Sequence, residues 1–328
     1  MTETRLPSVK IETTISATNA TQVPAIIERA GSGAKFAWDE FFFAKVRSPH
    51  TRRAYLRSIN RFLGWCEERS LELTQISPAD VGHFMDSLDL AVSSKKQALA
   101  AIRHLFDGMV NRHAVILNPA ASVRGERYTV VEGKTPEITV KQARSLLQSI
   151  DVADVVGLRD KAIISVLVYT AARVGAVSKL RVKDLYDSGD QYCLHFDDKG
   201  GKSREIPVRH DLQNLLFAYL QRADLQLGHD DTRPLFTTCI RKTKELTMRP
   251  MTAGDIGRMV KRRMAACGLP RRLSPHSFRV TTITDLLEQG VPLEDVQNLA
   301  GHADPRTTRL YDRRQKKITR NIVERISV

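Results

Sequence analysis

The sequence of 328 residues contains only four cysteines, and none lies near another. They are Cys66, Cys193, Cys239 and Cys267. No pair has the CxxC spacing of zinc and thiol-redox sites, and a reducing compartment leaves isolated cysteines as thiols. We therefore expect cysteines that fill the core, and no metal site.

Long apolar runs are missing as well. No run approaches the ~18 residues that a membrane-spanning helix needs, and the N-terminus lacks the charged-then-apolar pattern of a secretory signal. The glycines around Gly200 do not follow the GxxxxGK[ST] spacing of a nucleotide-binding loop. These absences predict a cytoplasmic protein that neither contacts a membrane nor binds a nucleotide.

Acidic residues are scarce relative to basic ones. Asp and Glu number 37 against 51 Lys and Arg, which gives a formal net charge of +14. An excess of this size favours a polyanionic partner over a small metabolite, although a basic surface can also serve solubility. The chain is long enough for two domains that each bury a core.

The first part of the chain reads as a tail followed by helices. Residues 1–34 are rich in Thr, Ser, Ala and Gly without sustained periodicity, which predicts a flexible tail. Helix-start signals at Ser48-Pro49 and Ser77-Pro78 then precede apolar residues at helical spacing, so residues 35–124 are expected to form a helical domain with basic outer faces. Such faces either contact DNA or are merely solvated. The candidates for DNA contact are Arg52, Arg53, Arg57, Lys95 and Lys96.

The second part of the chain combines helices with a small sheet. Gly and Pro interrupt the helical pattern over residues 125–136, which we predict to be a linker. Residues 137–328 begin with a capping-box signature at Thr139 and Gln142. Alternating apolar positions on both sides of a bend rich in Gly and Lys indicate a β-hairpin over residues 191–208. The expected fold is mainly α with a small antiparallel β-sheet in the second domain.

The most specific pattern lies near the C-terminus. His276 and Arg279 share one face of a helix that begins at Ser274-Pro275, and a helix N-terminus attracts phosphate. A glycine closes the next helix and leaves His302 in a loop, and Tyr311 is expected roughly two turns into a further helix. A phenol can attack phosphorus while cations and N–H donors stabilise the phosphate charge. This order of residues suits covalent chemistry on a phosphate.

These strings resemble the tyrosine recombinase family, also called the phage integrase family. The resemblance is carried by His276-Ser-Phe-Arg279 and by Leu299-Ala-Gly-His-Ala-Asp-Pro-Arg-Thr-Thr-Arg-Leu-Tyr311, and it extends back to Thr51-Arg-Arg-Ala-Tyr55. It implies a C-shaped DNA clamp, in which a helical SAM-like core-binding domain precedes the catalytic domain. It also implies six catalytic residues, which are Arg173, Lys199, His276, Arg279, His302 and the nucleophile Tyr311.

The resemblance implies a mechanism that needs no cofactor. Tyr311 attacks a DNA phosphate and forms a 3′-phosphotyrosine, while Arg173 and Arg279 clamp the non-bridging oxygens. A free phenol has a pKa near ~10, so a proton acceptor such as His276 is needed. Lys199 protonates the departing 5′-oxygen. Because the covalent bond retains the phosphodiester energy, rejoining needs neither ATP nor a metal, and repetition on two duplexes gives strand exchange.

The sequence departs from the family pattern around the first arginine. Ala176 stands where the family usually has an acidic residue, and Ala171-Ala172 replaces the common Gly-Leu. Lys202 competes with Lys199 as the hairpin lysine, and Lys202 and Arg204 are further candidates for DNA contact. All the reacting groups remain, so we expect activity. Two alternatives to a recombinase stay open, a DNA-binding relative that lost cleavage and a type IB topoisomerase, which shares the chemistry.

The C-terminal segment carries an apolar stripe on a predicted terminal helix. Its members are Ile318, Ile322, Val323 and Ile326. In the family such a helix often docks into a neighbouring protomer, although it can also fold back on its own domain. Cyclic exchange would give a tetramer on two DNA sites from a chain that is a monomer when free. Integration, excision, inversion and dimer resolution would share one active centre.

Overall fold

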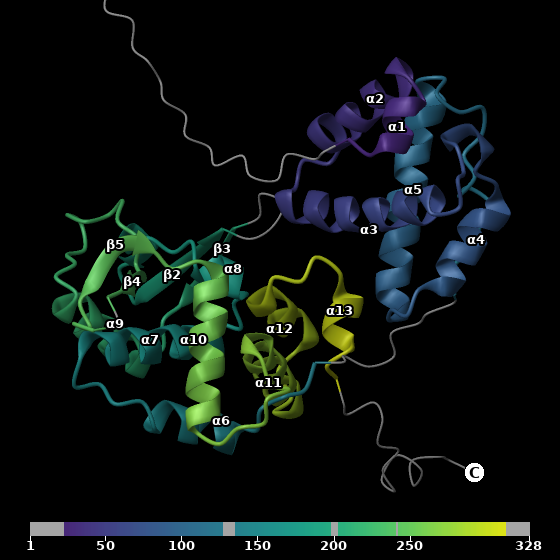
Figure 1. Cartoon of the computed structure of the whole chain (residues 1–328). Helices are drawn as coiled ribbons and strands as arrows, with labels where there is room; N and C mark the ends of the chain where they lie inside the picture. Colours follow the sequence, from purple (N-terminus) through teal and green to yellow (C-terminus); the bar gives the residue numbers. More distant parts are fainter. Residues whose placement is uncertain (1–22, 127–134, 198–202, 241, 313–328) are drawn as a thin grey trace, which may run out of the picture. The chain divides into compact units, whose positions relative to one another are not determined.

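The fold was analysed in a computed structural model of the whole chain, which describes residues 23–126, 135–197, 203–240 and 242–312. The chain forms two compact units that divide between Thr129 and Val130 (Figure 1). Each unit has its own apolar core, and each is described by itself.

The first unit is entirely helical over its described residues. Its elements are α1 (Ala25–Arg29), α2 (Ser32–Asp39), the π-helical turn η1 (Glu40–Lys45), α3 (Pro49–Glu67), the 3₁₀ turn η2 (Leu73–Gln75), α4 (Pro78–Ser87) and α5 (Val92–Asn111). The predicted helix starts are confirmed, because the Ser48 hydroxyl accepts a hydrogen bond from the Thr51 amide and Ser77 forms a capping box with Asp80. Aromatic rings fill the core, and Phe62 meets Phe84 at a centroid distance of 5.0 Å.

The predicted end of the N-terminal tail at residue 34 is wrong. Helix α1 already begins at Ala25, its Ile26 and Ile27 side chains are fully buried, and the Ile26 amide donates to the Glu67 carboxylate at 2.8 Å. A helix of five residues is too short to produce a periodic pattern, so sequence composition alone suggested a tail. Residues 1–22 lie outside the described part.

The second unit combines helices with two small antiparallel sheets. Its helices are α6 (Val140–Gln148), α7 (Val155–Tyr169), α8 (Val174–Val177), the 3₁₀ turn η3 (Val182–Asp184), α9 (His210–Arg222), α10 (Ala253–Ala266), α11 (Pro275–Glu288), α12 (Leu293–Ala300) and α13 (Pro305–Arg309). Its strands are β1 (Leu185–Asp187), β2 (Tyr192–Asp197), β3 (Ser203–Pro207), β4 (Thr237–Cys239) and β5 (Leu246–Pro250).

The expected class, mainly α with a small antiparallel sheet, is confirmed. Strands β2 and β3 form the predicted hairpin, with Leu194 opposite Ile206, and β1 adds a third strand. The capping box at Thr139 and Gln142 is also present. The β4–β5 hairpin was not predicted, because strands this short and polar give little alternation.

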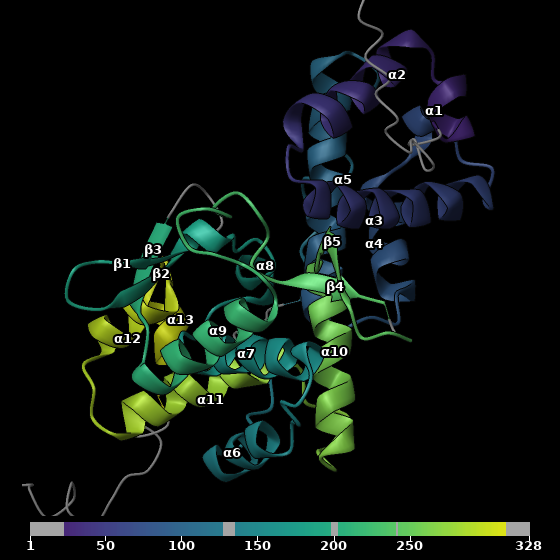
Figure 2. The same cartoon turned by 90° about the vertical axis from the view of Figure 1, so that its left-hand side faces the viewer.

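Helix α7 forms the centre of the second unit. It packs against α9, α10 and α11, which surround it in Figure 2, and it is apolar on nearly every side. Its buried charged residues are Arg159 and Asp160, joined at 2.7 Å. Arg159 also donates to the Thr237 carbonyl at 2.8 Å, and Arg263 of α10 reaches Asp160 at 2.8 Å. This ionic group ties α7 to α10 and to β4.

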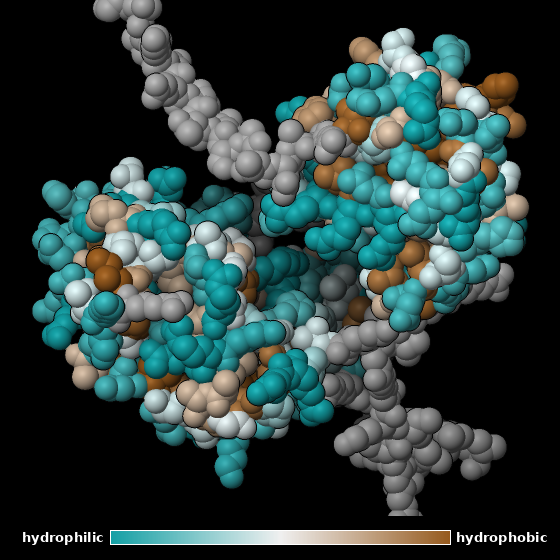
Figure 3. Space-filling view, in the orientation of Figure 1, coloured by the Kyte–Doolittle hydropathy of each residue, from teal (hydrophilic) through white to brown (hydrophobic). Residues whose placement is uncertain are grey.

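The surfaces of both units are predominantly hydrophilic in the view of Figure 3, with apolar residues scattered singly or in small groups. None of the described helices is long and apolar enough to cross a membrane. Within the same described ranges, no three His, Cys, Asp or Glu side chains are grouped so that they could hold a metal ion.

We expect Asp160→Asn to destabilise the second unit by about 3–5 kcal/mol, because it leaves the buried Arg159 guanidinium without its counter-charge. Urea unfolding measures the loss. Arg258→Gln removes an exposed ion pair with Asp255 on the same helix as Arg263 and serves as the control, with a much smaller expected effect. Equal losses in the two variants would contradict a structural role for the buried group.

Candidate active site

Arg279 and His276 lie in the first turns of α11, as the sequence predicted. Ser274 precedes the helix, and its amide donates to the Ser277 hydroxyl at 3.1 Å. His276 is exposed, whereas Arg279 is only 1% exposed. The Arg279 guanidinium donates to the Ala171 carbonyl at 2.5 Å and to the Ala300 carbonyl at 2.6 Å. It therefore joins the segment after α7 to the end of α12.

His302 is fixed by the turn that ends α12. Gly301 adopts a left-handed conformation with φ of 60°, which stops the helix and reverses the chain. The His302 amide donates to the Gln297 carbonyl at 3.2 Å, and Nδ1 of its ring lies 2.9 Å from the Thr308 hydroxyl. His302 is 8% exposed, and one hydrogen bond holds its backbone while the other holds its ring.

Tyr311 stacks on His302. The two rings are nearly parallel, with an interplanar angle of 8° and a centroid distance of 5.9 Å. The tyrosine follows α13, which ends at Arg309, so the prediction that it lies within a helix is wrong. A five-residue helix opened by Asp304-Pro305 carries the chain only as far as the turn before Tyr311.

A small apolar cluster lies beneath this ring pair. It consists of Ala171, Ile283, Leu287, Val296 and Ala300, all fully or almost fully buried. Tyr311 is partly buried and packs against the cluster. Three segments, namely α11, α12 and the loop that follows α7, thus contribute to the apolar surface on which the tyrosine packs.

Positive charge gathers around the two histidines. Burial is the largest cause that lowers the pKa of His302 to about 4, and the nearby charges of Arg279 and Arg173 lower it further. His276 is open to solvent on one side, but desolvation by the surrounding protein atoms, followed by the charges of the same two arginines, also lowers its pKa. Both imidazoles are therefore neutral at pH 7 within a cationic site. The structure thus brings together Arg173, His276, Arg279, His302 and Tyr311.

Arg173 occupies an exposed position at the start of α8. Its carbonyl accepts the Ala176 amide at 2.9 Å, so the backbone of Arg173 caps this short helix. Ala176 is 8% exposed and belongs to the apolar core of the unit. A carboxylate here would have to be desolvated, and alanine removes that cost together with the charge.

Ala171 takes a conformation that usually requires glycine. Its φ is +48°, in the left-handed region, and the resemblance noted above places a family glycine at this position. The methyl group is nevertheless fully buried in the cluster beneath Tyr311, and the carbonyl accepts from Arg279. Backbone strain at Ala171 is thus offset by packing at the site.

Arg204 lies at this site as well, although the sequence suggested only a DNA contact for it. It donates to the Leu299 carbonyl, its guanidinium carbon lies 5.4 Å from the centre of the Phe196 ring, and its charge helps to lower the pKa of His302. The alternation along β3 places Arg204 opposite Phe196, but no sequence pattern indicated its partner in α12.

The other candidates for DNA contact fall in two groups. Five belong to the first unit, where Arg53, Arg57 and Lys96 are exposed on α3 and α5. Arg52 instead donates to the Val46 carbonyl at 3.2 Å, and Lys95 pairs with Glu126 at 3.2 Å. Lys199 and Lys202, the two candidates for the hairpin lysine, lie outside the described residues.

Ala171→Gly should cost less than about 1 kcal/mol of unfolding free energy, because relief of the left-handed strain offsets the lost methyl group. Ala162 is equally buried but lies inside α7, so Ala162→Gly should cost about 2 kcal/mol. Urea unfolding of both variants tests the comparison. Similar costs at the two positions would show that Ala171 is not strained.

The depressed pKa of His302 makes stability depend on pH. Between pH 6.5 and about 4 the unfolded chain binds a proton that the folded chain excludes, so stability falls as the pH drops through this window. From pH 7 to 4.5, the wild type should lose about 1–3 kcal/mol more than His302→Asn. His229→Asn, at an exposed histidine, should follow the wild type; a parallel course for His302→Asn would refute the assignment.

Models of known protein families match both units of the chain. The sequence model of the phage integrase family matches residues 136–317, and the model of the phage integrase N-terminal SAM-like domain matches residues 37–113. Tyrosine recombinase XerC of Myxococcus xanthus is 29% identical over 272 residues, which cover 81% of this chain and 88% of that protein.

The fold is similar to two solved structures. One is XerH site-specific recombinase bound to palindromic difH substrate in a post-cleavage complex, with 20% identity, a TM-score of 0.68, and coverage of 90% of this chain and 86% of the other. The other is a lambda integrase tetramer bound to a Holliday junction, with 17% identity, a TM-score of 0.61, and coverage of 89% of this chain and 80% of the other. The family match spans more than half of the chain, from before Arg173 to beyond Tyr311, and the chain belongs to the phage integrase family of tyrosine recombinases.

Proposed function

We propose that the chain is a site-specific recombinase that cuts and rejoins DNA through a 3′-phosphotyrosine bond at Tyr311. One observation carries the proposal. The phenol stacks on a buried, neutral imidazole, and three arginines influence that imidazole electrostatically. A nucleophile beside neutral proton acceptors and fixed cations suits attack on a phosphodiester.

In the proposed cleavage step, the Tyr311 oxygen forms a bond to phosphorus as the bond from phosphorus to the 5′-oxygen breaks. His276 takes the phenolic proton. It can do so because its lowered pKa leaves the imidazole unprotonated at pH 7. Arg173 and Arg279 stabilise the charge on the non-bridging oxygens. Lys199, outside the described residues, protonates the departing 5′-oxygen. A 5′-hydroxyl from another strand then reverses the reaction.

His302 would act as a hydrogen-bond donor to the phosphate. When the Thr308 hydroxyl donates to Nδ1, the proton of the neutral ring resides on Nε2, which can donate to a phosphate oxygen. The stacked Tyr311 ring keeps the phenol next to that donor. In that arrangement, the hydrogen bond from Thr308 supports the tautomer that the reaction needs.

The substrate we propose is double-stranded DNA, bound by both units. The net charge of +14 supports this, as do the exposed basic side chains of Arg53 and Arg57 on α3. The solved relatives include complexes with DNA, and we infer that the present chain likewise acts on DNA in the cytoplasm.

We also propose that the chain assembles as a tetramer on two DNA sites through the predicted C-terminal helix, whose residues lie outside the described part of the chain. The apolar stripe from Ile318 to Ile326 would need an acceptor. Between α6, α7 and α11, the second unit carries a groove of about 450 Å³ whose apolar lining includes Leu147, Val168 and Leu286. A groove of this kind suits one face of an amphipathic helix.

Covalent trapping tests the cleavage reaction. Adducts are first mapped on genomic DNA fragments to find the site, which is then prepared as a nicked duplex whose cut strand cannot rejoin. The wild type should accumulate a protein–DNA adduct, and Tyr311→Phe should form none while binding DNA equally well, because only the phenolic oxygen is removed.

The outcomes also separate the alternatives. A DNA-binding relative without cleavage would bind the duplex and give no adduct with either chain. A type IB topoisomerase would relax plasmids without a preferred sequence, whereas a recombinase exchanges strands only between its sites. An undiminished adduct in Tyr311→Phe would remove Tyr311 as the nucleophile.

A further inference from the structure

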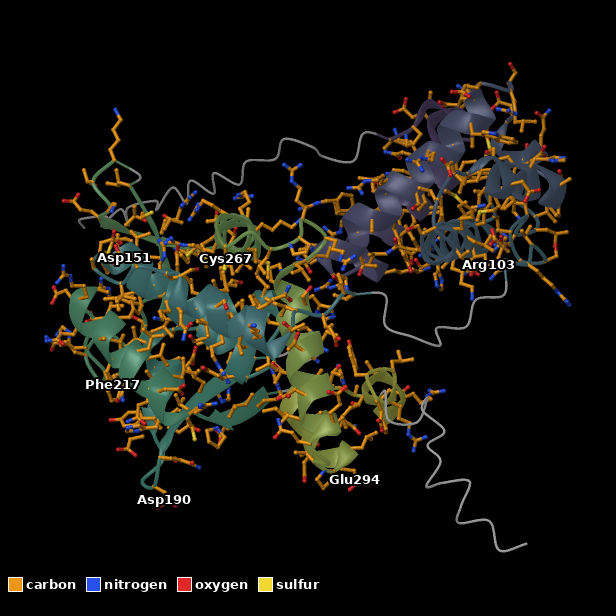
Figure 4. All side chains as sticks on the ribbon, turned by 90° about the horizontal axis from the view of Figure 1, so that it is seen from below. Arg103, Asp151, Asp190, Phe217, Cys267 and Glu294 are labelled. Carbon is orange, nitrogen blue, oxygen red and sulfur yellow. The ribbon has the colours of Figure 1, made fainter. Side chains whose placement is uncertain are left out.

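Two arginines bind the C-terminal end of α12. The Leu299 carbonyl accepts from Arg204, and the next carbonyl, that of Ala300, accepts from Arg279 at 2.6 Å. The last carbonyls of a helix have no partners within the helix, and the helix dipole favours cations there. At the opposite end of this helix, the first turn contains the acidic residues Glu294, which is labelled in Figure 4, and Asp295. Both ends of α12 are thus electrostatically stabilised.

Arg204 is held firmly from the side of the sheet. It stands on β3 directly opposite Phe196 of β2, with its guanidinium over that ring. Phe196 is fully buried in the core of the second unit. The hydrogen bond to Leu299 therefore joins two segments 95 residues apart, the β2–β3 hairpin and the end of α12.

The end of α12 determines where His302 lies. The Gly301 amide donates to the Asn298 carbonyl at 3.0 Å and the His302 amide to the Gln297 carbonyl at 3.2 Å, so the turn continues directly from the helix. Tyr311 then stacks on the His302 ring. A displacement at Leu299 is consequently transmitted through the turn to both rings.

We propose that Arg204 is a positioning residue of the cleavage site. It fastens the β2–β3 hairpin to the end of α12 and so fixes the positions of His302 and Tyr311 relative to the hairpin. The inference rests on the proposed strand-cleavage function. The planar guanidinium can lie on Phe196 and donate to Leu299 together, whereas a lysine ammonium offers no flat surface for stacking. A lysine at position 204 should therefore keep the positive charge but not hold the hairpin against the end of α12.

Hydrogen–deuterium exchange of the free protein tests the fastening without DNA. In both Arg204→Lys and Arg204→Gln, the amides of residues 299–303 should exchange on the order of 10-fold faster, because the end of α12 opens more often. Arg181→Gln is the control, since it removes a comparable bond to the Thr232 carbonyl in the same unit. Unchanged exchange at residues 299–303 in both Arg204 variants would overturn the proposal.

Single-turnover cleavage of the nicked duplex tests the consequence for the reaction. At saturating DNA, Arg204→Lys and Arg204→Gln should form the adduct on the order of 10-fold more slowly or worse, with affinity and salt dependence unchanged. If Arg204 only contacted a DNA phosphate, Arg204→Gln would instead bind DNA more weakly and with a shallower salt dependence. It would then cleave at the normal rate at saturating DNA. That result would contradict a positioning role.

Two precautions keep the test decisive. Thermal unfolding shows whether each variant is folded at the assay temperature, and Arg204→Lys, which keeps the charge, carries the comparison if Arg204→Gln is not. The wild type is the reference for cleavage. If the wild type forms no adduct at all, the proposed function fails, while the exchange result still decides whether Arg204 fastens α12.

Discussion

The buried guanidinium of Arg279 holds together segments that are far apart in the sequence. Its two bonds to Ala171 and Ala300 close the loop after α7 against the end of α12, with α11 between them. Burying a charge in this way is tolerated only because carbonyl oxygens receive its N–H groups. Arg173, His276 and His302 are carried by these segments, so their relative geometry depends on this one side chain.

The same cation shapes the chemistry of its neighbours. Desolvation by the surrounding protein is the largest cause that lowers the pKa values of His276 and His302, and the charges of Arg279 and Arg173 lower them further. Both rings are therefore neutral at pH 7 and, in the proposed reaction, available to accept or donate a proton beside the DNA phosphate. Strain at Ala171 belongs to the same arrangement, because its left-handed backbone aims a carbonyl at Arg279.

Much of the fold could be predicted from local signals. Capping residues such as Ser77 and Thr139 mark helix starts because the bonds they make are local, and alternation in β2 and β3 marks the hairpin for the same reason. The grouping of His276, Arg279, His302 and Tyr311 followed from their order along the chain. The position of Arg204 could not be predicted, because its partner lies 95 residues away and is a backbone carbonyl that carries no sequence signal.

The ionisation of His302 tests the central claim most directly, because after burial the charge of Arg279 is the largest cause that lowers its pKa. The Cε1 proton resonance of His302, assigned with His302→Asn, is followed by NMR from pH 7.5 to 3.5 in the free protein. We predict a transition at a pKa of about 4, and a higher one in Arg279→Met, in which a charge is lost. A His302 that titrates at an ordinary histidine pKa, unaltered by Arg279→Met, would contradict the account.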